Sequence, residues 1–108
     1  MKHLRARFEF RNSGSLPAKN VVWRADARLV EYTDKAADGE WQKASESDHP
    51  VPVDAGGNVG LELDLWRPLE QPFPKEVQFR FRFDWEGEKE PWVRIIRYDF
   101  TNSTWGPS

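Results

Sequence analysis

The chain has 108 residues, with 16 Lys and Arg against 18 Asp and Glu and a formal net charge of −2. This length suits one domain, and the near balance of charge leaves no overall attraction for nucleic acid or anionic lipid. The absence of cysteine excludes disulfides, thiolate metal sites and a cysteine nucleophile, and no apolar run approaches the roughly 20 residues of a membrane span. We therefore expect a single domain over 1–108 that binds no nucleic acid and does not insert directly into a membrane.

Apolar and polar residues alternate in the first two runs of the chain. The apolar positions are Leu4, Ala6, Phe8 and Phe10 in the first run, and Val21, Trp23, Ala25, Ala27 and Leu29 in the second. A period of two places one set of side chains in a core and the other in water, as in a half-buried strand. Each run therefore predicts an antiparallel strand, and Trp23 stands where sandwiches often carry a buried tryptophan.

Two later runs alternate in the same way, and a third does so less regularly. The regular runs carry Val59, Leu61, Leu63 and Leu65, then Val77, Phe79, Phe81, Phe83 and Trp85. In the last run, over 91–100, Arg94 falls among the apolar positions and Val93 and Ile95 lie on the opposite face, which predicts a bulge or an edge strand partly covered on both faces. A short strand holding Trp41 is also expected over 40–44.

Turn residues separate all these runs and leave no interval long enough for a sizeable helix. The pattern predicts an all-β fold, an immunoglobulin-like antiparallel β-sandwich of six to seven strands over about 3–101, with a tail over 102–108. The predicted core contains Phe8, Phe10, Trp23, Leu61, Leu63, Phe79, Phe81 and Phe83.

Two segments, FEFRNSGSLPAKNV at 8–21 and VDAGGNV at 53–59, resemble the CARDB-type family of bacterial immunoglobulin-like modules. The shared features are an apolar strand, an Asn-x-Gly turn, a Pro-Ala step, an Asn-Val strand entry and a later glycine turn. The resemblance covers about the first two thirds of the chain. It implies a sandwich fold similar to adhesion and surface-display repeats, and it says little about function.

The usual strand before Leu4 of such modules is missing here, and no tandem copy follows. We therefore expect the domain to end a longer, bacterial envelope-associated protein. Its open sheet edge would be paired by upstream residues or by a second copy, as in an edge-paired homodimer. A cell-envelope or extracellular location is favoured, with the cytoplasm left open.

Arginines gather on the outward positions of the predicted strands and form a candidate partner-binding face. They are Arg24, Arg28, Arg80, Arg82 and Arg97, accompanied by Asp26, Asp84 and Asp99. If these strands are neighbours, the face has a local basic excess that suits an acidic partner. The simpler interpretation is a set of cross-strand Arg–Asp pairs.

Tryptophans provide a second candidate site. Trp66, Trp92 and Trp105 lie on polar parity, at a strand end or in the tail, where exposed rings can stack on sugars or pack on a neighbouring domain. Capping of the open ends of a small sandwich is the alternative.

Catalytic and metal-binding candidates are few. Ser45, Ser47 and His49 share a polar stretch, but neighbours along a loop rarely converge as a triad. The acidic residues of 84–90 resemble no defined Ca²⁺ loop, and the two histidines are too few for a zinc site. We expect no catalytic, cofactor-binding or metal-binding residues.

The sequence thus favours a non-catalytic interaction or spacer module that binds a protein partner, or a neighbouring domain, through a sheet edge or the arginine face. The alternative is a carbohydrate-binding module that uses exposed tryptophans. A small hydrolase using His49 with Ser45 or Ser47 is the least favoured hypothesis.

Overall fold

The computed structural model describes residues 4–30, 41–65, 75–100 and 102–107. These residues form eight strands: β1 (Leu4–Arg11), β2 (Ala18–Val30), β3 (Gln42–Glu46), β4 (Val51–Val53), β5 (Asn58–Leu65), β6 (Glu76–Asp84), β7 (Trp92–Asp99) and β8 (Thr104–Pro107). The described part of the chain contains no helix, and hence none able to span a bilayer.

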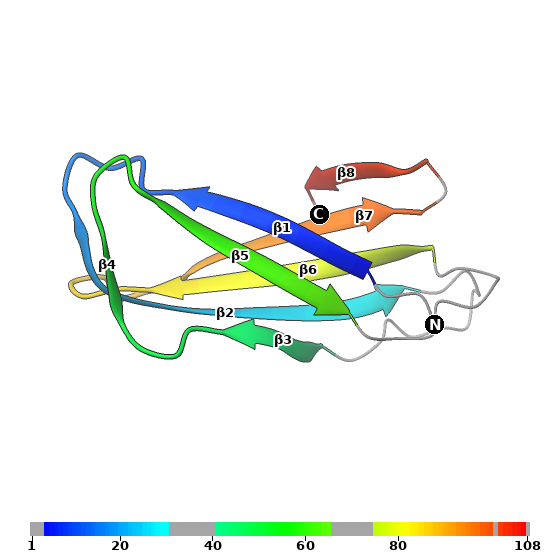
Figure 1. The fold of residues 1–108 in the computed structure, drawn as a ribbon, viewed down its shortest axis with the longest axis horizontal. Coiled ribbons are helices and arrows are strands. Elements are labelled where there is room, and N and C mark those ends of the chain that lie inside the picture. The colour runs from blue at the N-terminus through cyan, green and yellow to red at the C-terminus, as the bar shows by residue number, and fades with distance from the viewer. Residues whose placement is uncertain (1–3, 31–40, 66–74, 101, 108) are drawn as a thin grey trace.

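The strands form two antiparallel sheets (Figure 1). The larger sheet has the order β3-β2-β6-β7-β8, with β4 also paired to β2, and the smaller contains β1 and β5. In Figure 1 the smaller sheet crosses over the larger one, with β5 toward β3 and β1 toward β8. The predicted all-β antiparallel sandwich is confirmed, with eight strands in place of six to seven because the alternating runs did not include β4 and β8.

The register between β2 and β6 explains how the alternation builds a core. Ala25 lies opposite Phe81 and Ala27 opposite Phe79, so small side chains leave room beside large rings. Phe8 of β1 fills this room, with its ring centroid 4.7 Å from that of Phe81 and 5.2 Å from that of Phe79. A slip of one residue would turn every ring toward water, so burial fixes the register.

The core agrees with the prediction in position and differs in degree of burial. Among the predicted core residues, Leu61, Leu63, Phe79, Phe81 and Phe83 are buried, and Phe8, Phe10 and Trp23 are partly buried and packed against them. The two-stranded layer is narrower than the sheet beneath it, which explains why its own rings remain partly accessible.

Two predictions about the C-terminal part are wrong. The register between β6 and β7 is continuous, so Arg94 lies on the inner face without a bulge; the register shifts occur in β2 instead. The predicted tail over 102–108 contains β8, which pairs with β7 and places Trp105 opposite Tyr98.

The turn after β1 is held by Asn12. Its side-chain Nδ2 donates to the carbonyls of Leu16 and Val53, at 3.0 and 3.1 Å, and its Oδ1 accepts from the N–H of Gly14. The Asn12 backbone N–H donates to the carbonyl of Gly57 at 2.9 Å, next to Gly56, which has a φ of 77°. These bonds join the end of β1 to the start of β5.

Candidate binding surfaces

The five arginines of the predicted partner face do lie together, on the outer side of the larger sheet. Arg24 stands opposite Arg82 and Asp26 opposite Arg80 between β2 and β6, while Arg97 on β7 stands opposite Gln78. Three of the acceptors among them are buried: Asp26 is 4% exposed, and Glu76 and Gln78 are comparably covered.

Each of these arginines contacts an acceptor on the same face. Asp26 binds two guanidiniums, with 2.9 Å from Arg24 Nε to Oδ1 and 3.2 Å from Arg80 Nη2 to Oδ2. The remaining contacts are Arg28 Nε to Gln78 Oε1 at 2.8 Å, Arg82 Nε to Asp84 Oδ2 at 3.2 Å and Arg97 Nη1 to Glu76 Oε2 at 3.6 Å. Gln78 links two of these contacts by donating to Glu76. Within the described residues no buried side-chain polar atom lacks a partner.

Trp41 covers part of this face. Its ring centroid lies 4.3 Å from the Arg28 guanidinium carbon and 4.6 Å from that of Arg80, within the range of cation–π attraction. The sequence predicted a short strand over 40–44 that holds Trp41, whereas β3 begins at Gln42, immediately after this ring. A ligand of the arginine face would have to compete with both the carboxylates and this ring.

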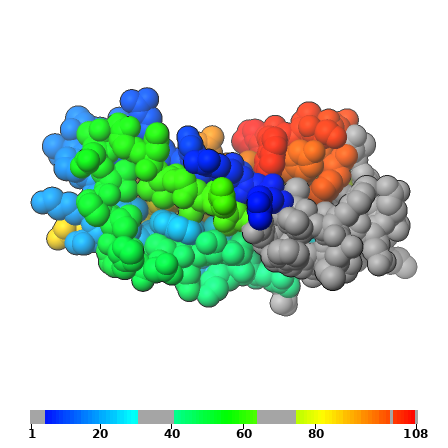
Figure 2. All heavy atoms as spheres, in the orientation of Figure 1, coloured from blue at the N-terminus to red at the C-terminus, as the bar shows by residue number. Residues whose placement is uncertain are grey.

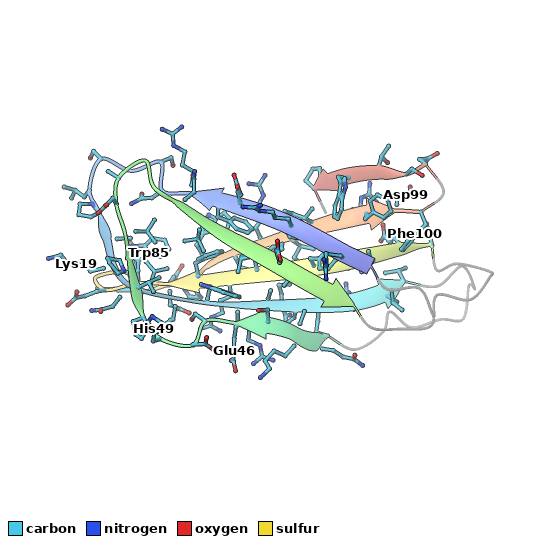
Figure 3. All side chains as sticks on the ribbon, viewed as in Figure 1. Lys19, Glu46, His49, Trp85, Asp99 and Phe100 are labelled. Atoms are coloured by element: carbon cyan, nitrogen blue, oxygen red, sulfur yellow. The ribbon has the colours of Figure 1, made fainter. Side chains whose placement is uncertain are left out.

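Glu46 ends β3 at the rim of the same sheet (Figure 3). Lys43 Nζ lies 2.9 Å from Glu46 Oε1. The hydrogen bond and the charge of this ammonium lower the pKa of the Glu46 carboxyl below its usual range, and Arg24 adds a smaller attraction.

The predicted stacking tryptophans lie in different surroundings. Trp66 lies outside the described residues. Trp92 and Trp105 are 38% and 49% exposed, and both belong to the inner face of the larger sheet. The Trp105 centroid lies 5.5 Å from Phe8 and 4.8 Å from Tyr98, while Trp92 lies 5.7 Å from Phe10. Both rings therefore border β1 on the side away from β5.

That side of β1 is an open edge. Among the strands described, only β5 pairs with β1. The direction of the backbone N–H groups alternates from one residue to the next along an antiparallel strand. Because the Asn12 N–H donates toward β5, the N–H groups of Arg7, Glu9 and Arg11 point away from β5. Figure 2 shows β1 at the surface beside the β7–β8 hairpin. We call the β1 edge together with Trp92 and Trp105 the aromatic edge.

Two of the other sheet edges, those of β5 and β8, are less open. The outer side of β5 packs against β3, and β8 is short and ends in Gly106 and Pro107, which blunt an edge.

The hydrolase candidates do not form a relay. The Ser47 Oγ accepts the backbone N–H of Trp23 at 3.0 Å, and Ser45 lies opposite Ala25 in the β2–β3 register. His49 is exposed in the loop between β3 and β4 (Figure 3), and within the described part of the chain no hydrogen bond joins it to either serine.

The acidic turn after β6 is likewise dispersed. Asp84 contacts Arg82 at 3.2 Å, and Glu86 Oε2 accepts from Asn20 Nδ2 at 3.3 Å. Among the residues that the structure describes, no three His, Asp or Glu side chains are grouped to bind a metal ion.

Comparison with protein-family models finds no family that matches this chain, and comparisons with curated proteins and with solved structures find no match either. The resemblance to CARDB-type modules stays a prediction from the segments 8–21 and 53–59.

Proposed function

We propose that this domain is a non-catalytic interaction module that binds an extended segment of a protein partner, or of a neighbouring domain, along the aromatic edge. The observation that carries the proposal is that the outward backbone N–H groups of Arg7, Glu9 and Arg11, which pair with none of the described strands, lie on the same border as two exposed tryptophans. An added strand would receive backbone hydrogen bonds from β1 and lay its inward side chains on Trp92 and Trp105. Strand addition of this kind joins main-chain affinity to side-chain specificity.

The arginine face supports this function less well. Its guanidiniums are already bound to Asp26, Glu76, Gln78 and Asp84, so a new acidic partner would replace existing contacts rather than add to them. Exposed ion pairs contribute only about 0–1 kcal/mol each, and salt screens them further.

Self-pairing of β1 is opposed by its charges. An antiparallel pair of β1 strands centred on Phe8 would match Arg7 with Glu9 but place Arg5 directly opposite Arg11. Every register that overlaps three or more of these outward charges puts at least one like-charged pair opposite, which destabilises a sheet. A partner of different sequence therefore fits the edge better than a second copy.

The test uses a blocked nine-residue peptide of alternating valine and threonine, N-methylated along its outer edge so that it does not self-associate. We expect slower amide hydrogen exchange at Arg7, Glu9 and Arg11 when the peptide binds. Glu9→Pro should lower the affinity about tenfold or more, because proline removes an edge N–H and adds a ring there. The matched control is Glu62→Pro, which alters the outer edge of β5 and should leave the affinity unchanged.

Carbohydrate binding is the alternative that the same experiment separates. Tryptophan fluorescence that shifts with oligosaccharides and is lost in Trp92→Ala, with unchanged amide exchange along β1, would overturn the proposal.

A further inference from the structure

Arg94 lies on the inner face of the larger sheet, in β7, at a position where the alternation predicts an apolar residue. It stands opposite Phe81 in the β6–β7 register and shares a face with Trp92 and Ile96. Its side chain is exposed, and within the described part of the chain it forms neither a hydrogen bond nor an ion pair. It thus differs from the five arginines of the outer face, each of which contacts an acceptor.

The position of Arg94 matches what an added strand would present. Side chains on one face of a strand are spaced about 6.8 Å apart, the repeat that separates Trp92, Arg94 and Ile96 along β7. A strand paired to β1 would lie over β7 and β8, and three successive inward side chains would fall over this row. The outer two would meet apolar surface, and the middle one would meet a guanidinium.

We infer that the segment bound at the aromatic edge carries an acidic side chain between two apolar ones, in the order apolar–x–acidic–x–apolar, and that its carboxylate pairs with Arg94. This inference rests on the proposed function. Once covered by the strand, Arg94 would lie between Trp92 and Ile96 and be shielded from water, so leaving it unpaired would cost free energy. A carboxylate offers its fork two acceptors and removes that cost.

The test compares three versions of the valine–threonine peptide, with glutamate, glutamine or lysine at the central inward position. We expect the glutamate peptide to bind about tenfold more tightly than the glutamine peptide, and the lysine peptide to bind most weakly. The preference for glutamate should shrink as salt concentration rises.

Arg94→Gln should remove the preference for glutamate while leaving the protection of the Arg7, Glu9 and Arg11 amides by the glutamine peptide intact. The matched control is Arg82→Gln. Arg82 is exposed on the outer face of the larger sheet, so the substitution removes the same charge at a position away from the aromatic edge. This variant should keep the full preference.

The outcomes separate the two proposals. Equal binding of all three peptides with protected β1 amides would overturn the acidic specificity and support strand addition. Absence of amide protection with every peptide would overturn both. A dimer in sedimentation whose β1 amides are already protected without peptide would also overturn the acidic partner, in favour of a second copy.

Discussion

The outer face of the larger sheet and the aromatic edge hold the residues that stand out most in the sequence, arginines on one and tryptophans on the other. On the outer face, β2, β6 and β7 are neighbours, so each guanidinium finds an acceptor within the same sheet. At the aromatic edge, Trp92 and Trp105 extend beyond a covering layer of only two strands. A conspicuous residue type therefore indicates a binding surface only where the fold leaves its side chain exposed and available for a new contact.

The largest expected effect is a difference in unfolding free energy between substitutions on the inner and outer faces of β6. Phe81 is fully buried under Phe8 and Phe10, and Phe81→Ala should lower the free energy of unfolding by about 3–5 kcal/mol. Its neighbour Arg82 faces outward with half its side chain exposed, and Arg82→Ala should cost less than about 1 kcal/mol. Urea unfolding measures both. Similar losses for the two variants would contradict the assignment of inner and outer faces.

The second prediction concerns the centre of the outer face. Asp26→Ala should lower the free energy of unfolding by about 2–3 kcal/mol, because the buried carboxylate accepts from both Arg24 and Arg80. Asp84→Ala removes one contact at an exposed position and should cost less than about 1 kcal/mol. Thermal unfolding measures the stability of both variants. If Asp26→Ala and Asp84→Ala lowered it by the same small amount, the outer face would not be a connected network.

The third prediction tests whether Trp41 holds this network in place. Trp41→Ala should cost about 1 kcal/mol of unfolding free energy, since two partly exposed guanidinium contacts contribute roughly 0.5–1 kcal/mol each and some water replaces the ring. Trp41→Phe keeps an aromatic face and should recover part of the loss. The ring-current shifts of the Arg28 and Arg80 side-chain protons provide a direct measurement, and an unchanged spectrum in Trp41→Ala would reject the contact.

Alternation predicted the long strands and the core because a period of two leaves one arrangement with all rings inside. It missed β4 and β8, since short segments with Pro52 or with Gly106 and Pro107 have turn composition and become strands only beside longer neighbours. The contact between Arg80 and Asp26 joins positions 54 residues apart, so it depends on a register that the sequence does not reveal.

Arg94 shows the same limit at the candidate site. An inward-facing arginine conflicts with a covered core, so the break in alternation predicts a bulge or an edge strand partly covered on both faces. The register is continuous, and the conflict disappears because Arg94 lies on the exposed part of the inner face. The break in alternation identified Arg94 as unusual. Whether this inward-facing arginine is exposed depends on how much of the larger sheet the two-stranded layer covers.

The smallest expected effect lies at the rim of the outer face. Because Lys43 lowers the pKa of the Glu46 carboxyl in the folded chain, the ionised form is favoured by folding. The resulting stability is present above the pKa of the unfolded chain and is lost as pH falls through the folded pKa. Lys43→Met should return the Glu46 pKa toward its usual range in a carbon-13 NMR titration, and Lys43→Arg should keep it lowered. Since both side chains are about half exposed, the shift should fade in high salt; a shift that persisted would place this rim in the same shielded network as Asp26.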